Sequence, residues 1–173
     1  GESRPQQLLE RSELLDSSPN VHWHLIGHLQ RNKVRPMLGL VFRFHSADSF
    51  KLLDRMELLA AELDVSPKVL LEVNLSGEAS KDGFAAVELE SQWQALTKFS
   101  RVQITGLMTM APYTEDEDII RSVFRNLRLL RDRMESQSQG QFHLPELSMG
   151  MSHDFEIAIE EGATHIRIGS RLF

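Results

Sequence analysis

The feature that most constrains the fold of this chain is an alternation of short apolar runs with longer amphipathic segments. The apolar runs have the length and composition of strands, and the amphipathic segments repeat their apolar residues at helical spacing. Strands that alternate with helices predict a parallel sheet covered by helices. The predicted strands are 21–27, 41–45, 69–75, 102–108, 144–149 and 164–168, and the predicted helices are 5–16, 49–64, 85–99, 115–134 and 152–161.

The number of predicted strands leaves two versions of such a sheet open. A closed β/α barrel normally has about eight strands. The strands predicted here are fewer, so they would also suit an open doubly wound sheet. No Gly-rich dinucleotide fingerprint follows any predicted strand, which removes the main support for a doubly wound cofactor-binding sheet. The chain also begins with what reads as the end of a strand-to-helix loop. We therefore expect an α/β fold of the TIM-barrel type, with its first strand and helix missing from this chain.

Composition excludes several classes of protein. A net charge of -6 argues against a general nucleic-acid binder. Because the chain has no cysteine, neither a disulfide framework nor a thiolate metal site is available. No apolar run approaches the ~20 residues that span a bilayer, and the amino terminus does not resemble a signal peptide. We expect one soluble, cytoplasmic domain.

The last predicted strand carries an unusual charge. With a period of two, Ile166 and Ile168 face one side of the sheet, while Arg167 and Gly169 face the other. An arginine on the inner face of such an apolar strand needs a partner, because an unpaired buried charge is costly. One interpretation pairs Arg167 with Glu72, whose side chain also faces inward. The other assigns Arg167 to a ligand.

Small polar residues follow the last two predicted strands. Gly169 and Ser170 offer backbone N–H groups and a hydroxyl, and Ser152 lies where it would cap the helix predicted over 152–161. In parallel β/α folds, phosphate is often held by the loops after the last two strands. Each residue alone is also typical of an ordinary helix cap or turn. Taken together, they make a phosphate site about as plausible as these structural roles.

Histidines and arginines suggest two further interpretations. His22, His24 and His28 have the spacing that begins the metal site of some barrel hydrolases, with His45 and Asp154 as further ligand candidates. No clean ligand set emerges, so we expect polar histidines with ordinary partners and no metal site.

Acidic residues accompany the arginines of the long predicted helix, which favours a solvated surface over a nucleic-acid face. These arginines are Arg121, Arg125, Arg128, Arg131 and Arg133.

Four segments carry a resemblance to a known family. They are WHLIGHLQRNK at 23–33, GLMTM at 106–110, LSMGMSHDF at 147–155 and IRIGS at 166–170. In this order they resemble the pyridoxal-phosphate homeostasis protein family, and the resemblance runs almost from end to end. It implies a single β/α barrel related to the amino-terminal barrel of alanine racemase, the type III fold of pyridoxal-phosphate proteins. It also implies a protein that binds pyridoxal 5′-phosphate (PLP) and buffers or delivers it without catalytic turnover.

The resemblance assigns roles within the site. Arg167 matches the family position that contacts the pyridine nitrogen, and a guanidinium there would keep that nitrogen unprotonated and weaken the cofactor as an electron sink. Ser3 stands where the family has an asparagine. The cofactor-binding residues expected besides Arg167 are Gly169, Ser170 and Ser152 around the phosphate, Met149 in the pocket wall, and Asn74 and Ser3 as polar contacts.

The sequence departs from the family pattern at both ends. The family's Schiff-base lysine lies on the first strand, upstream of Gly1, so no catalytic residue is expected in this chain. The family also usually continues beyond Phe173, so we expect the barrel domain over 1–173 to be incomplete at both ends. The lysines of this chain are predicted to be solvated charges in helices or loops. They are Lys33, Lys51, Lys68, Lys81 and Lys98.

A PLP-dependent enzyme of the racemase type is the alternative. It would need a second acid–base group, which a partner domain usually supplies, and no second domain is present here. The preferred interpretation expects a monomer that is not an enzyme. Its partners would be the small-molecule cofactor and PLP-dependent apo-enzymes, with no nucleic acid and no membrane.

Overall fold

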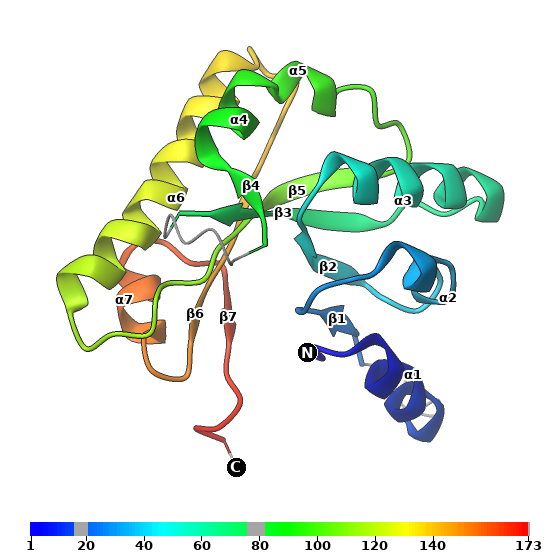
Figure 1. Cartoon of the computed structure of the whole chain (residues 1–173), viewed down its shortest axis with the longest axis horizontal. Coiled ribbons are helices and arrows are strands. Elements are labelled where there is room, and N and C mark those ends of the chain that lie inside the picture. Colours follow the sequence, from blue (N-terminus) through cyan, green and yellow to red (C-terminus); the bar gives the residue numbers. More distant parts are fainter. Residues whose placement is uncertain (16–20, 76–81, 173) are drawn as a thin grey trace.

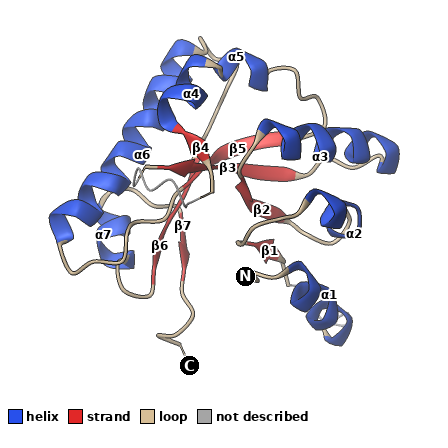
Figure 2. Ribbon diagram, viewed as in Figure 1, coloured by secondary structure: helices blue, strands red, loops and turns tan. Residues whose placement is uncertain are grey.

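The structure is a computed structural model that describes residues 1–15, 21–75 and 82–172. Within them, one curled sheet is surrounded by helices (Figures 1 and 2). None of the described helices has the length and apolar character needed to cross a membrane. The strands are β1 (His24–Leu25), β2 (Arg43–Ala47), β3 (Lys68–Asn74), β4 (Phe84–Ala85), β5 (Gln103–Met108), β6 (Glu146–Met151) and β7 (His165–Arg167). The helices are α1 (Pro5–Leu14), the 3-10 turn η1 (Arg31–Lys33), α2 (Val34–Leu38), α3 (Phe50–Leu63), α4 (Ala86–Ser91), α5 (Trp93–Leu96), α6 (Glu117–Gln137) and α7 (Phe155–Glu160).

The order of the strands identifies the architecture. The sheet runs β1-β2-β3-β5-β6-β7, β4 pairs with β3 beside this path, and every pair is parallel. In a doubly wound sheet the strand order reverses at a switch point, whereas here it follows the chain, as in a barrel. The sheet curls into part of such a barrel (Figure 1). The expected α/β fold of the TIM type is therefore confirmed.

Side chains on the inner face show how far the sheet curls. The imidazole of His45 on β2 lies 2.8 Å from the hydroxyl of Ser148 on β6. The guanidinium of Arg43 on β2 forms a 2.6 Å ion pair with Glu146 on β6. In the strand order, β3 and β5 separate β2 from β6. These contacts therefore cross the interior and do not run along the sheet.

The apolar core lies between the outer face of the sheet and the helices. Helix α6 contributes a stripe at the predicted helical spacing, and Asp116 caps its first turn by accepting the N–H groups of Asp118 and Ile119. Ser49 caps α3 by accepting the N–H of Leu52. The buried stripe of α6 consists of Ile120, Val123, Phe124, Leu127, Leu130 and Met134.

Three local features differ from the predicted elements. The short strand β4 and the turn formed by η1 and α2 were not predicted, because two to five residues are too few for a periodic pattern to show. The helix predicted over 85–99 is interrupted between α4 and α5, where Gln92 leaves the helical conformation. The helix predicted over 152–161 begins only at Phe155. The predicted loop over 76–83 falls mostly outside the described residues.

Close packing between β5 and β6 requires a glycine. Gly106 pairs with Glu146, and a Cβ atom at Gly106 would lie 1.9 Å from the carbonyl oxygen of Glu146. That oxygen belongs to the backbone of a central strand and has little freedom to move. At Gly39, after α2, a Cβ atom would meet no atom within 4 Å.

We therefore predict that Gly106→Ala lowers the free energy of unfolding by about 3 kcal/mol, since the added methyl group must push β5 and β6 apart. Gly39→Ala should leave it nearly unchanged. Urea unfolding followed by circular dichroism measures both variants. Equal stability of the two would contradict the close approach of these strands.

Candidate functional site

A cavity of about 690 Å³ opens on the inner side of the curled sheet, near the carboxyl ends of the strands. We call it the inner cavity. Its wall contains residues of β1, β2, β3, β6 and β7, together with the first three residues of the chain. The loops after parallel strands build the sites of β/α barrels, so this is the expected location for a ligand.

Arg167 projects from β7 into this cavity. Its Nη1 donates to the hydroxyl of Ser148 at 2.8 Å, and its Nη2 donates to the carbonyl of Thr109 at 3.0 Å. Burial lowers the pKa of Arg167, while Asp154 and Glu72 act in the opposite direction. A guanidinium nevertheless stays protonated at physiological pH. Between the described residues Arg167 and Glu72 there is no ion pair, so the alternative pairing predicted from the sequence does not form.

A chain of hydrogen bonds continues from Ser148. Its hydroxyl lies 2.8 Å from His45 Nδ1, and His45 Nε2 lies 2.8 Å from His24 Nδ1. Burial, together with the neighbouring imidazoles and arginines, lowers the pKa of His45 to about 2. Burial and Arg43 lower the pKa of His24 to about 4. Both imidazoles are therefore neutral at physiological pH, and the prediction that these histidines have ordinary polar partners is confirmed.

A second arginine organises the amino-terminal part of the inner face. Arg43 pairs with Glu146, and its Nη1 donates to His165 Nε2 at 3.0 Å. Because arginine only donates, His165 Nε2 accepts, and in the neutral ring Nδ1 then carries the hydrogen. This Nδ1 lies 2.9 Å from the hydroxyl oxygen of Thr164. Burial and Arg43 lower the pKa of His165. His165 and Arg167 share one face of β7, and the contact of His165 with Arg43 was not predicted from the sequence.

The residues predicted to hold phosphate lie close together. The N–H of Gly169 donates to the hydroxyl of Ser152 at 3.2 Å, which joins the ends of β6 and β7. Ser152 does not cap a helix, as the sequence had suggested. The turn before α7 is instead closed by Asp154, whose carboxylate accepts the N–H of Met151 at 2.5 Å. Ser170 is exposed beside Gly169.

The other predicted site residues differ in position. Ser3 lines the inner cavity, and Asn74 ends β3 on the same face as Glu72 but is not part of the cavity wall. Met149 is fully buried in the apolar core and is not part of the cavity wall. It lies on the outer face because Ser148, the residue before it, occupies the inner one. A register shift between Ser148 and Met151, where Gly150 has a φ of 93°, breaks this alternation, and Met151 lines the cavity.

Glu72 is the acidic residue of the cavity wall that is most buried, with 6% of its surface exposed. Within the part of the chain that the structure describes, its carboxylate has no hydrogen bond and no ion pair. Burial, together with the negative charges of Asp48 and Asp82, raises the pKa of Glu72 to about 7. The group therefore changes charge near neutral pH.

The lysines lie away from this cavity. Lys33, Lys51 and Lys98 are exposed, as predicted. Lys68 begins β3, so its assignment to a helix or loop was wrong, and its Nζ lies 5.1 Å from the ring centre of Phe42. Among the described residues no lysine lines the inner cavity. Lys81 is outside the described residues.

The histidine set proposed for a metal does not assemble. His22 stacks on Phe42 with ring centres 4.3 Å apart, and His45 binds Ser148 and His24. Asp154 closes the turn before α7. Among the described residues, a different group meets the spacing of metal ligands, namely His28, Asp48 and Asp82.

Comparison with protein families places the chain among alanine racemase-like domains. The family model described as alanine racemase, N-terminal domain, matches residues 9–173. The pyridoxal phosphate homeostasis protein of Aquifex aeolicus (strain VF5) is 44% identical over 173 residues, which cover 100% of this chain and 75% of that protein. The pyridoxal phosphate homeostasis protein of Synechocystis sp. (strain ATCC 27184 / PCC 6803 / Kazusa) is 36% identical over 172 residues, covering 99% of this chain and 78% of that protein.

Solved structures agree with this placement. PipY of Synechococcus elongatus PCC7942, solved with PLP bound, superposes with a TM-score of 0.93 at 37% identity, covering 100% of this chain and 80% of that chain. Alanine racemase of Clostridium difficile 630 superposes with a TM-score of 0.81 at 13% identity, covering 99% of this chain and 43% of that chain, and shows a shared fold. The chain belongs to the pyridoxal phosphate homeostasis protein family.

Proposed function

We propose that this protein binds PLP in the inner cavity and serves in the homeostasis of that cofactor, without catalytic turnover of its own. The observation that carries the proposal is the guanidinium of Arg167, held inside a cavity of about 690 Å³. Pockets for cofactors commonly enclose about 300–1,000 Å³. The relatives named above as homeostasis proteins, and the PLP-bound structure of PipY, support the same ligand.

The free donors of Arg167 suit the pyridine nitrogen. A guanidinium has five N–H groups, and Ser148 and Thr109 accept one each. The remaining N–H groups are available to a ligand, while the two bonds fix the position of the group. Arginine can only donate, so it would bind an unprotonated ring nitrogen.

The ends of β6 and β7 suit the phosphate. Around Gly169 there is open space, since a Cβ built there would meet no atom within 4 Å. Ser152 accepts the N–H of Gly169, which leaves its own hydroxyl hydrogen free to donate to an anion. Ser170 offers a second, exposed hydroxyl. Together with Arg167 these groups would hold the two ends of one cofactor molecule, and Ser3 would contact it from the other wall.

The same arrangement favours storage and delivery of the cofactor over catalysis. When bound, PLP supplies an aldehyde and an electron-withdrawing ring, and this electron withdrawal is weak while the ring nitrogen carries no proton. Arg167 would maintain that state. We expect a monomer that releases the cofactor to PLP-dependent apo-enzymes.

The first experiment measures PLP binding by isothermal titration calorimetry. We predict that Arg167→Ala raises the dissociation constant at least about tenfold, because hydrogen bonds from a charged donor contribute about 1.5–3 kcal/mol. Arg133→Ala removes an exposed arginine of α6 that pairs with Glu90, and it should bind like the unmodified protein. Thermal unfolding confirms that both variants fold. Equal affinity of the two variants would exclude the proposed pocket.

The second experiment tests the absence of turnover. With PLP added, the chain is expected not to racemise L- or D-alanine above the rate of free PLP, as followed by chiral chromatography. Racemisation that is lost in Arg167→Ala but kept in Arg133→Ala would establish the enzyme alternative instead.

The third experiment uses the charge of Glu72. Because its pKa is raised to about 7, this carboxyl group is neutral in acid and ionised in base, where it repels an anionic cofactor. We predict that Glu72→Gln binds PLP like the unmodified protein at about pH 5.5, and several-fold more tightly at about pH 8.5. The titration of PLP itself affects both proteins equally, so the ratio of their two dissociation constants at each pH reports the effect of Glu72 alone. Metal-free buffer is used, and Glu88→Gln on α4 is the control.

An affinity ratio between the unmodified protein and Glu72→Gln that does not change with pH would show that Glu72 does not face the bound cofactor. A ratio that changes equally for Glu88→Gln would show a general charge effect and no local one.

A further inference from the structure

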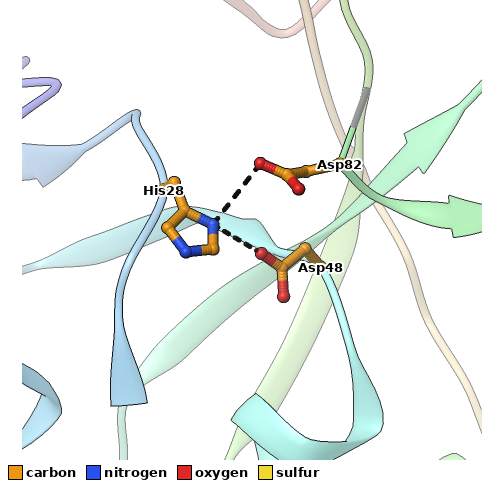
Figure 3. A group of neighbouring side chains, drawn as sticks. All are labelled: His28, Asp48 and Asp82. Atoms are coloured by element: carbon orange, nitrogen blue, oxygen red, sulfur yellow. Dashed lines mark ion pairs between the residues drawn. The ribbon is translucent and has the colours of Figure 1, made fainter. Parts of the chain in front are cut away.

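Three side chains meet at the rim of the inner cavity, and we call them the His28 cluster: His28, Asp48 and Asp82. His28 follows β1, Asp48 follows β2, and Asp82 precedes β4 (Figure 3). The imidazole Nδ1 lies 2.8 Å from Asp48 Oδ2 and 3.6 Å from Asp82 Oδ2. One ligand atom from each residue lies within 4.8 Å of the other two.

The simplest interpretation of this cluster is an ion pair at the surface. The side chains of His28 and Asp82 are 51% and 66% exposed, and exposed ion pairs contribute little to stability. This interpretation leaves two negative charges around one imidazole. It also leaves Glu72, which lines the same cavity as His28 and Asp82, without a partner.

Glu72 is the independent observation that points to a cation. It is nine-tenths buried, and in the described part of the chain nothing donates a hydrogen bond or forms an ion pair to its carboxylate. Asp48 and Asp82 are the acidic residues whose charges act on it most strongly. A carboxylate beside two further carboxylates raises the local negative potential, and a bound cation would offset it.

We propose that His28, Asp48 and Asp82 bind a divalent cation through one imidazole nitrogen and two carboxylate oxygens. The bound ion would be Zn²⁺ or Mn²⁺, because an imidazole ligand suits these ions better than Mg²⁺ or Ca²⁺. The inference goes beyond PLP binding and does not depend on it.

The two distances from His28 are close to those around such an ion. Ligand atoms at about 2.0–2.2 Å from one ion lie about 3.0–3.6 Å from each other. The separation of His28 from Asp82 already matches this range, and that of His28 from Asp48 needs to lengthen by a few tenths of an ångström. His28 would give up its Nδ1 hydrogen and keep the one on Nε2. Its exposed side chain has room for this change.

An ion can reach the cluster from two sides. His28 and Asp82 line the inner cavity, whereas His28 and Asp48 line a second hollow of about 490 Å³ that also contains Ser49 and Lys51. The remaining coordination positions would therefore be open to water. A cation there would offset the carboxylates at the cavity mouth, including Glu72.

The test titrates Zn²⁺, and separately Mn²⁺, into chelator-treated protein without PLP. Calorimetry for Zn²⁺ and electron paramagnetic resonance for Mn²⁺ should each show one bound equivalent. His28→Gln and Asp82→Asn change exposed side chains and should keep the fold, but each should weaken binding at least about tenfold. His143→Gln is the matched control, since His143 is an exposed imidazole 3.3 Å from Glu135 outside the cluster. It should bind like the unmodified protein.

A shift of the His28 Nδ1 resonance on adding Zn²⁺, read by nitrogen-15 NMR, would show direct coordination. Equal affinity of the unmodified protein, His28→Gln and Asp82→Asn would overturn the proposal, and so would a His28 resonance that does not move. PLP binding is measured on separate samples of the same proteins. Failure of PLP binding with the cation site intact would count only against the proposed function, and the reverse result only against the cation site.

Discussion

The inner face of this protein is arranged around a charge that cannot be removed. Arg167 lies on the inner face of β7, and a buried guanidinium must find acceptors because it does not lose its proton. The acceptors are the hydroxyl of Ser148 and the carbonyl of Thr109, on and beside the neighbouring strands β6 and β5. The hydroxyl of Ser148 links this pairing to His45 and His24. The apolar core lies on the outer face, between the sheet and the helices.

The pairing also limits the tautomers of the histidines to two arrangements. Ser148 accepts from Arg167, so its own hydrogen either points to His45 Nδ1 or is left free while His45 donates. In the first case His45 donates from Nε2 to His24, and in the second it accepts there. Each imidazole carries one hydrogen in both cases. A second proton on His45 would place a positive charge in a buried site beside two further imidazoles and two arginines, and this lowers the pKa of that residue.

The sequence was sufficient for the fold and for the direction of Arg167, because both depend on periodicity. A period of two within a strand and the alternation of strands with helices are local patterns that survive in the structure. The partners of Arg167 could not be predicted, since Thr109 and Ser148 lie 58 and 19 residues away and meet it only through the order of β5, β6 and β7. That Met151 and not Met149 would line the cavity could not be predicted, because the two have the same parity and only a register shift between Ser148 and Met151 separates them. The helix cap predicted at Ser152 does not form, because α7 begins only at Phe155. The turn before it is closed by the hydrogen bond from the Met151 N–H to the Asp154 carboxylate.

The charges of the inner cavity are distributed unevenly, and this constrains any ligand. Arg167 and the Gly169 N–H belong to β7 and its loop, whereas Glu72 and Asp82 belong to β3 and the approach to β4. An anionic group is stabilised beside the first pair and repelled by the second when Glu72 is ionised. A molecule that carries a phosphate therefore has one favourable orientation, with the phosphate at the loop after β7 and away from Glu72 and Asp82. The carboxylates act as a barrier against the reverse orientation, and they do so only while they remain uncompensated by a cation.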